Sequence, residues 1–186
     1  MLAQKNHKLK SKIQKNSIQL NSSMTNVLDF LKFSKCNNNF FSTYFEKLNS
    51  KILDINDKEL LAAVQLILKT HQNKNKIMIF GNGGSAAMAS HITVDFTKAV
   101  GIRATNYNEA DLITCLSNDF GYQNWVSKAL EFYADKGDTI ILISSSGTSP
   151  NIINGAKKAN EMGLKVISFT GFKKLNAVSK NSYLNF

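Results

Sequence analysis

The sequence has no long hydrophobic run: none of its apolar stretches approaches the roughly 20 residues that a transmembrane helix needs. The N-terminal stretch MLAQKNHKLKSKIQKNSIQL lacks the apolar core of a secretory signal peptide. Cysteine is also scarce, because Cys36 and Cys115 are the only two and are too far apart in sequence for a disulfide framework or a metal knuckle. These absences predict a cytoplasmic protein with reduced thiols and no membrane contact.

Two nucleotide-binding signatures are missing as well. The glycine-rich stretch GNGGS at 81–85 does not have the GxGxxG spacing, and no acidic residue ends the second apolar strand to hold a ribose, so a nicotinamide cofactor is disfavoured. The sequence also lacks GxxxxGK[ST], which excludes a P-loop ATPase.

The formal net charge of +10 is concentrated at one end of the chain. Residues 1–39 contain seven lysines and a single acid, Asp29, and no aromatic residue before Phe30. This composition predicts a flexible, solvated basic tail over 1–39 and disfavours a nucleic-acid-binding arm. The smaller positive excess in residues 40–186 favours an anionic small-molecule ligand.

The pattern becomes regular after residue 40. Two amphipathic helices are predicted first, FFSTYFEKLNSKIL and then NDKELLAAVQLILKTHQNKNK, with Asn56 and Glu59 as a capping pair. Short apolar strands follow at KIMIF, IRATNY, DTIILI, KVISF and SYLNF, with helical patterns over 84–99, 121–136 and 150–163. This alternation predicts an α/β domain with a mostly parallel sheet covered by helices on both faces.

Two loops at the carboxyl ends of the predicted strands are suited to ligand binding. GNGGSAAMASH offers three glycines for close backbone approach, with Asn82 and Ser85 as hydrogen-bonding side chains. ISSSGTSPN gathers hydroxyls at a helix start, with Ser149 as N-cap and Pro150 as first helical residue. Either loop alone is equally typical of a capping turn without a ligand. Two such loops in one sheet favour a phosphate site.

The motifs GNGGSAAMASHITVDF, SNDFGY and ISSSGTSPN resemble the SIS (sugar isomerase) domain family, and within it the sedoheptulose 7-phosphate isomerases. The resemblance covers about residues 40–186. It implies a three-layer α/β/α sandwich, flavodoxin-like, with a five-stranded parallel sheet and two N-terminal helices, assembled as a homotetramer. It also implies production of D-glycero-D-manno-heptose 7-phosphate, a heptose precursor of surface polysaccharides such as lipopolysaccharide.

By that resemblance, three groups of residues bind a phosphorylated sugar. The serine loop contacts the phosphate, the glycine loop lines the sugar, and SNDFG meets its hydroxyls. The residues implied are Ser144, Ser145, Ser146 and Ser149 for the phosphate, Asn82, Gly83, Gly84 and Ser85 in the glycine loop, and Asn118 with Asp119.

The resemblance assigns catalysis and metal binding to His91 and Asp95, which the spacing places on one face of a helix. In the family these are a histidine and a glutamate that help to hold zinc, and the glutamate is an acid/base. Asp95 is one methylene shorter than that glutamate. Aldose–ketose isomerisation moves a proton between C1 and C2 through an enediolate, so a base, an acid and a group that stabilises an oxyanion are required.

Two other function classes stay open: a non-catalytic phosphosugar-binding regulator with an SIS domain, and an SIS protein that associates with the replication initiator. The latter type has GNGTS where this chain has Gly84. The resemblance further implies a C-terminal helix with the remaining zinc ligands, a glutamine and a histidine, beyond Phe186. We therefore expect the chain as given to have little isomerase activity and a weakened tetramer.

Overall fold

The computed structural model describes residues 39–186, so the predicted flexible tail lies outside the described residues apart from Asn39. The chain divides into two units, Met1–Asp54 and Ile55–Phe186. In the first, helix α3 (Phe40–Leu53) is the one described element, and none of its residues is buried. It exposes several large apolar side chains, including Phe41, Phe45 and Ile52.

The second unit contains alternating helices and strands. Its elements are α4 (Asp57–Gln72), β1 (Ile77–Gly81), α5 (Gly84–Val94), the π-helical turn η1 (Asp95–Ala99), β2 (Ala104–Asn106), α6 (Ala110–Phe120), the 3₁₀ turn η2 (Tyr122–Asn124), α7 (Trp125–Tyr133), β3 (Thr139–Ser144), α8 (Pro150–Glu161), β4 (Lys165–Thr170), the 3₁₀ turn η3 (Ser179–Asn181) and β5 (Leu184–Asn185). Over the residues described, no helix combines the length and the apolar character needed to cross a membrane.

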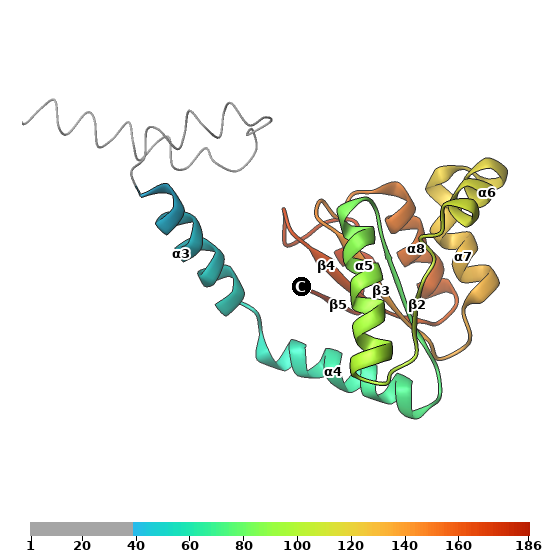
Figure 1. Cartoon of the computed structure of the whole chain (residues 1–186), viewed down its shortest axis with the longest axis horizontal. Coiled ribbons are helices and arrows are strands. Elements are labelled where there is room, and N and C mark those ends of the chain that lie inside the picture. The colour runs from blue at the N-terminus through green and yellow to red at the C-terminus, as the bar shows by residue number, and fades with distance from the viewer. Residues whose placement is uncertain (1–38) are drawn as a thin grey trace, which may run out of the picture. The chain divides into compact units, whose positions relative to one another are not determined.

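The five strands form one parallel sheet, as predicted, and their order is β2-β1-β3-β4-β5. Within this unit, α5 lies against one face, and α7 and α8 lie against the other (Figure 1). The strand order reverses between β1 and β3, because the chain leaves β1 toward β2 on one side and returns to β3 on the other. In open parallel sheets, this switch point at the carboxyl ends of the strands is where ligands bind.

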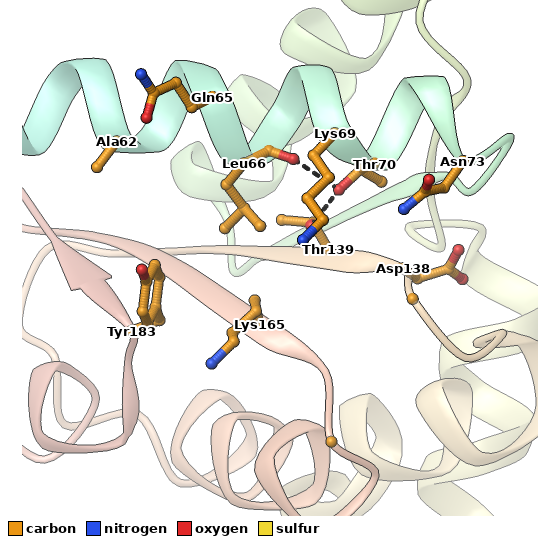
Figure 2. Close-up of a pocket in the computed structure, with 12 residues that line it drawn as sticks. Ala62, Gln65, Leu66, Lys69, Thr70, Asn73, Asp138, Thr139, Lys165 and Tyr183 are labelled. Atoms are coloured by element: carbon orange, nitrogen blue, oxygen red, sulfur yellow. Dashed lines mark hydrogen bonds between the residues drawn. The ribbon is translucent and has the colours of Figure 1, made fainter.

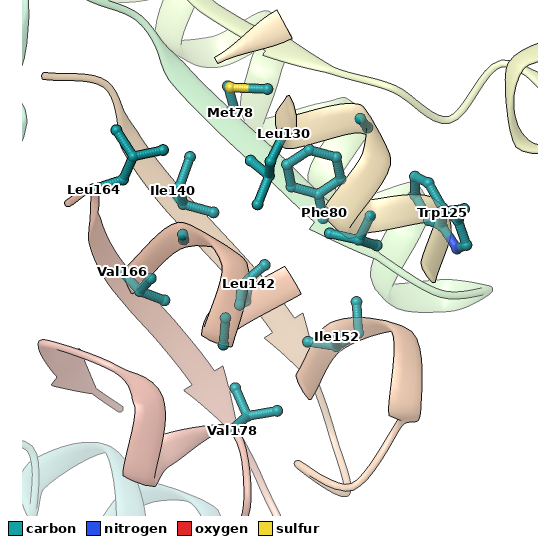
Figure 3. Close-up of a cluster of buried hydrophobic side chains, with 14 of the residues drawn as sticks. Met78, Phe80, Trp125, Leu130, Ile140, Leu142, Ile152, Leu164, Val166 and Val178 are labelled. Carbon is teal, nitrogen blue, oxygen red and sulfur yellow. The ribbon is translucent and has the colours of Figure 1, made fainter. Parts of the chain in front are cut away.

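The core has two layers because strand side chains alternate between the two faces of the sheet. Figure 3 shows the layer under α7 and α8, in which Met78, Phe80 and Trp125 pack together. The opposite layer places Ile77, Ile79, Ile141, Ile143 and Ile167 against Ala63 of α4 and Ala89 of α5. Since both faces are covered, the central strands are apolar throughout, which is why they could be recognised in the sequence.

Two details of the helices differ from the sequence-based prediction. Helix α6 was not predicted, because its sequence ADLITCLSNDF mixes polar and β-branched residues. The SNDF motif therefore forms the end of a helix, which stops at Gly121 with φ of 82°. The apolar face of α4 also differs. Helical spacing predicts one face made of Leu60, Leu61, Val64, Ile67 and Leu68. In the structure Ala63, Leu66 and Ile67 pack on the core, while Leu60, Leu61, Val64 and Leu68 are exposed.

Candidate functional site

The serine loop, residues 144–149, runs from the end of β3 into the first turn of α8. Ser149 is the N-cap residue and Pro150 the first helical residue, as predicted, but the Ser149 hydroxyl makes no capping bond. The Ser146 hydroxyl oxygen accepts from the backbone N–H and the hydroxyl of Thr148, at 3.2 and 3.0 Å. Its own hydrogen therefore remains available to donate to a ligand.

The serine loop also presents unpaired backbone donors. The N–H groups of Ser145, Ser146 and Ser149 donate no hydrogen bond within the part of the chain that the structure describes. Ser144 differs, since it is buried and its hydroxyl oxygen accepts from the N–H of Gly147 at 3.2 Å. Free donors beside the positive end of the α8 dipole favour an anion at this position.

The loop after β4 holds the serine loop in place. The carbonyl of Ser145 accepts hydrogen bonds from the N–H groups of Gly171 and Phe172, at 2.9 and 3.0 Å. The carbonyl of Gly147 accepts from the N–H of Val178 at 3.1 Å. Because these bonds occupy carbonyl oxygens, they fix the loop and leave its donors free.

The glycine loop, residues 81–85, depends on two of its glycines. A Cβ at Gly81 would overlap the backbone of Ser85, so only glycine permits this close approach of α5. Gly83 has φ of 53°, a conformation that other residues rarely adopt. Gly84 has no neighbour within 4 Å of a would-be Cβ, and the Ser85 hydroxyl makes no hydrogen bond within residues 39–186. Both therefore remain open to a ligand.

Asn82 joins the glycine loop to the other two site segments. Its amide exchanges two hydrogen bonds with Asn151 of α8, at 3.0 and 2.8 Å. The Tyr122 hydroxyl donates to the Asn82 side-chain oxygen at 3.2 Å. The three segments that the sequence motifs singled out therefore meet at one amide group.

Asn118 and Asp119 lie exposed at the end of α6, and Phe120 and Gly121 separate them from the turn that begins at Tyr122. The Asn118 side-chain N–H donates to Asp119 Oδ1 at 2.9 Å, and the Cys115 thiol donates to Asp119 Oδ2 at 3.9 Å. Their role in binding sugar hydroxyls stays a prediction.

His91 and Asp95 lie one helical turn apart, with His91 Nε2 3.4 Å from Asp95 Oδ2. Both side chains are exposed, at 80% and 59%. His91 is therefore not a core histidine among aliphatic side chains, whereas its catalytic role stays a prediction. Asp95 also begins the π-helical turn, a rare geometry that is frequent at functional sites.

The described residues do not form a complete zinc site. His91 and Asp95 provide two donors, and no group of three or more His, Cys, Asp or Glu residues gathers anywhere in residues 39–186. Stable protein zinc sites use three or four such ligands. The side chains at hand therefore do not fit resident zinc, and no chemical step is assigned to a metal.

A cavity of about 390 Å³ lies at the opposite end of the sheet, between α4 and the amino ends of β3 and β4 (Figure 2). Lys69 and Lys165 at its rim are exposed. Its buried polar groups already have partners, since Thr70 bonds Thr139 at 2.7 Å and Asp138 pairs with Lys76 at 2.6 Å. Burial disfavours the charge on Lys76, but hydrogen bonds to Asp135 and Asp138 outweigh it and raise the Lys76 pKa. This cavity offers no free buried donor for a ligand.

Three residues of the site were missed by sequence reasoning: Tyr122, Asn151 and Asn176. Asn176 is buried and supports Gly147, while its amide donates to Thr170 Oγ1 and the Lys173 carbonyl. Of the three, only Asn151 had a signal in the sequence: the spacing of Asn151 and Asn154 places two asparagines on one face of α8.

Comparison with known proteins agrees with the fold and the motifs. The profile of the SIS domain matches residues 41–171. The phosphoheptose isomerase of Aliarcobacter butzleri is 37% identical over 130 residues, which are 66% of this chain and 68% of that protein. The phosphoheptose isomerase of Helicobacter pylori strain P12 is 33% identical over 127 residues, 65% of this chain and 66% of that protein. The chain thus spans about two thirds of the length of these relatives.

Comparison with solved structures also finds phosphoheptose isomerases and other proteins of the same fold. The phosphoheptose isomerase GmhA from Neisseria gonorrhoeae superimposes with a TM-score of 0.71 at 28% identity, covering 80% of this chain and 84% of that one. The NanR protein of Vibrio vulnificus, complexed with ManNAc-6P, has a TM-score of 0.59 at 18% identity over 87% of this chain and 50% of its own, which shows the fold alone. The chain belongs to the SIS domain family, with phosphoheptose isomerases among its relatives.

Proposed function

We propose that this protein is a phosphosugar isomerase that converts sedoheptulose 7-phosphate to D-glycero-D-manno-heptose 7-phosphate, for surface polysaccharide heptose. The observation that carries this proposal is the convergence on Asn82 of the Tyr122 turn and of the first turn of α8, which directly follows the serine loop. The relatives named phosphoheptose isomerase support the choice of substrate.

The serine loop binds the phosphate in this proposal. The unpaired N–H groups of Ser145, Ser146 and Ser149 and the free hydroxyls of Ser146 and Ser149 are the donors. A phosphate dianion gains from each charge-assisted hydrogen bond and from the α8 dipole. Because the phosphate is remote from C1 and C2, its binding positions the reacting carbons.

The isomerisation needs one carbon-bound proton to move. A base removes a proton from C1 of the ketose, and the resulting enediolate takes a proton at C2, while the hydroxyl proton passes from O1 to O2. We assign the proton transfer at carbon to Asp95, with His91 beside it at 3.4 Å. Asn82, Gly83 and Gly84 line the sugar, and Asn118 with Asp119 meet its hydroxyls.

A homo-oligomer, a tetramer by family resemblance, is part of the proposal. The outer face of α4 exposes Leu60, Leu61, Val64 and Leu68, each between 41% and 57%. Such a contiguous apolar stripe on one helix suits the interface with a second copy of the chain. We also propose a cytoplasmic location, because a charged sugar phosphate does not cross a bilayer unaided.

The test is turnover by the purified protein. Sedoheptulose 7-phosphate should be converted to the aldose 7-phosphate slowly but detectably by nuclear magnetic resonance, while fructose 6-phosphate should react much more slowly still. Saturable binding of sedoheptulose 7-phosphate without any product would replace the isomerase by the non-catalytic phosphosugar-binding regulator.

A further inference from the structure

Among residues 39–186, the hydrogen bonds around Asn82 leave its side chain only one free group. Its oxygen accepts from the Asn151 amide at 2.8 Å and from the Tyr122 hydroxyl at 3.2 Å. One of its two N–H groups donates to the Asn151 oxygen at 3.0 Å. Since an amide oxygen has two lone pairs, the second N–H of Asn82 is the one group left for a ligand.

Asn151 is suited to hold that orientation because it is itself immobilised. It occupies the first turn of α8 and is 1% exposed. A reciprocal amide pair cannot rotate on one side without breaking both bonds, and a buried amide that loses its partner is costly. The direction of the free N–H of Asn82 is therefore set by Asn151, which lies 69 residues away in sequence.

A second asparagine on the same face of α8 holds the neighbouring turn. The side-chain N–H groups of Asn154 donate to the Gln123 carbonyl at 3.0 Å and to Asn124 Oδ1 at 3.2 Å. The Asn124 amide in turn donates to the Phe120 carbonyl at 2.9 Å. The turn that carries Tyr122 is thus tied to the helix whose start forms the serine loop.

We propose that Asn151 is a positioning residue, which makes Asn82 a fixed hydrogen-bond donor toward a substrate oxygen and keeps the glycine and serine loops at a set spacing. The inference rests on the proposed function for its substrate. A fixed donor aimed at the sugar stabilises an oxygen that gains negative charge, such as the carbonyl oxygen that becomes part of the enediolate. Such a donor stabilises the transition state most when it does not have to reorient during the reaction.

The kinetic test compares Asn151→Leu and Tyr122→Phe with Asn160→Ala. Asn160 lies at the opposite end of the same helix from the serine loop, and its amide donates to the Asn181 carbonyl at 2.8 Å. We expect Asn151→Leu to lower kcat for sedoheptulose 7-phosphate by about tenfold or more, and Tyr122→Phe to lower it less, since one bond is lost instead of two. Inhibition by inorganic phosphate, which needs only the serine loop, should change less than about twofold. Asn160→Ala should leave both kcat and the inhibition by inorganic phosphate unchanged.

Hydrogen exchange on the ligand-free protein gives a readout that does not depend on turnover. The amides of Ser85, Ala86 and Ala87, which bond to carbonyls of the glycine loop, should exchange faster in Asn151→Leu than in Asn160→Ala. If the wild-type protein produces no heptose phosphate, the proposed function fails while exchange still decides the role of Asn151. Equal exchange in the two variants, or an unchanged kcat in an active Asn151→Leu protein, would overturn the inference. Should Asn151→Leu not fold, the same comparisons apply to Asn151→Asp, which keeps the shape of the side chain and loses the N–H that Asn151 donates to Asn82.

Discussion

The backbone of Gly147 lies directly against the side-chain amide of Asn176, so close that a Cβ at position 147 would overlap it. Gly147 also has φ of 63°, which favours glycine for a separate reason. Asn176 is buried, and its side-chain oxygen accepts from the N–H of Ser179 at 2.9 Å, so it cannot move aside freely. The serine loop therefore has its shape because a loop from the next strand packs beneath it.

Gly147→Ala should lower the free energy of unfolding by more than the cost of a strained φ, which is about 1 kcal/mol. Gly163→Ala is the matched control, since Gly163 has φ of 72° but nothing within 4 Å of a would-be Cβ. The two values come from urea titration of each variant. A Gly147→Ala protein as stable as Gly163→Ala would show that the contact with Asn176 carries no constraint.

Replacing Ser146 and Ser149 together by alanine should weaken binding of inorganic phosphate by a few kcal/mol. Each hydroxyl is free to donate, and a hydrogen bond to a charged group is worth about 1.5–3 kcal/mol. Calorimetric titration measures the loss. Ser182→Ala is the control, because that hydroxyl donates to the Val178 carbonyl at 2.9 Å and lies outside the loop. Unchanged phosphate affinity in the double variant would remove the serine loop from the site.

Leu61→Glu combined with Val64→Glu should reduce the molar mass of the protein in solution, measured by light scattering. The two side chains are 57% and 50% exposed on the outer face of α4, and a charge buried in an apolar interface is costly. Gln65→Glu adds a charge to the same helix outside that stripe and should leave the mass unchanged. If the double variant has the same molar mass as the unaltered protein and Gln65→Glu, the subunit interface lies elsewhere.

The stability contributed by Glu131 should depend on pH. Hydrogen bonds from Lys128 and then Lys158 hold the pKa of Glu131 below its ordinary value of 4.5. A carboxyl with a depressed folded-state pKa contributes stability above its unfolded pKa and loses it as the pH falls through the folded value. Glu131→Gln should therefore cost about 0.5 kcal/mol at pH 7, and nothing once the pH is well below 4.5.

Urea titrations of both proteins over that pH range measure the difference. Glu109→Gln is the control, since Glu109 forms no ion pair in the described part of the chain. If Glu131→Gln lowers the free energy of unfolding equally at pH 7 and at low pH, the stabilisation does not come from the charge of the Glu131 carboxylate.

The sheet could be predicted because its strands are short apolar runs whose burial on both faces leaves few alternatives. Strand β3 at Thr139–Ser144 and β4 at Lys165–Thr170 match the predicted runs to within a residue or two. Helix α6 could not be predicted in the same way, because its residues have middling helix propensities and only Leu116 is buried. Its formation depends on packing against η2 and α7.

Within the candidate site, local motifs were predictable and long-range contacts were not. Spacing alone placed His91 and Asp95 on one helical face, where they lie 3.4 Å apart. Loop composition gave Ser149 as an N-cap residue. The bond between Asn82 and Asn151 depends on how β1 and β3 bring two loops together, and neither residue's neighbours in sequence encode it.

The central claim is that this chain moves a proton between C1 and C2 of a phosphorylated ketose, and isomerisation in D₂O tests it most directly. We expect sedoheptulose 7-phosphate to give an aldose 7-phosphate that carries deuterium at C2, because a carboxylate base exchanges its proton with solvent before returning it. Asp95→Asn should reduce this turnover at least about a hundredfold, the usual scale of general acid–base catalysis. Recovery of unlabelled sedoheptulose 7-phosphate alone, under conditions where the protein is saturated with it, would contradict the account.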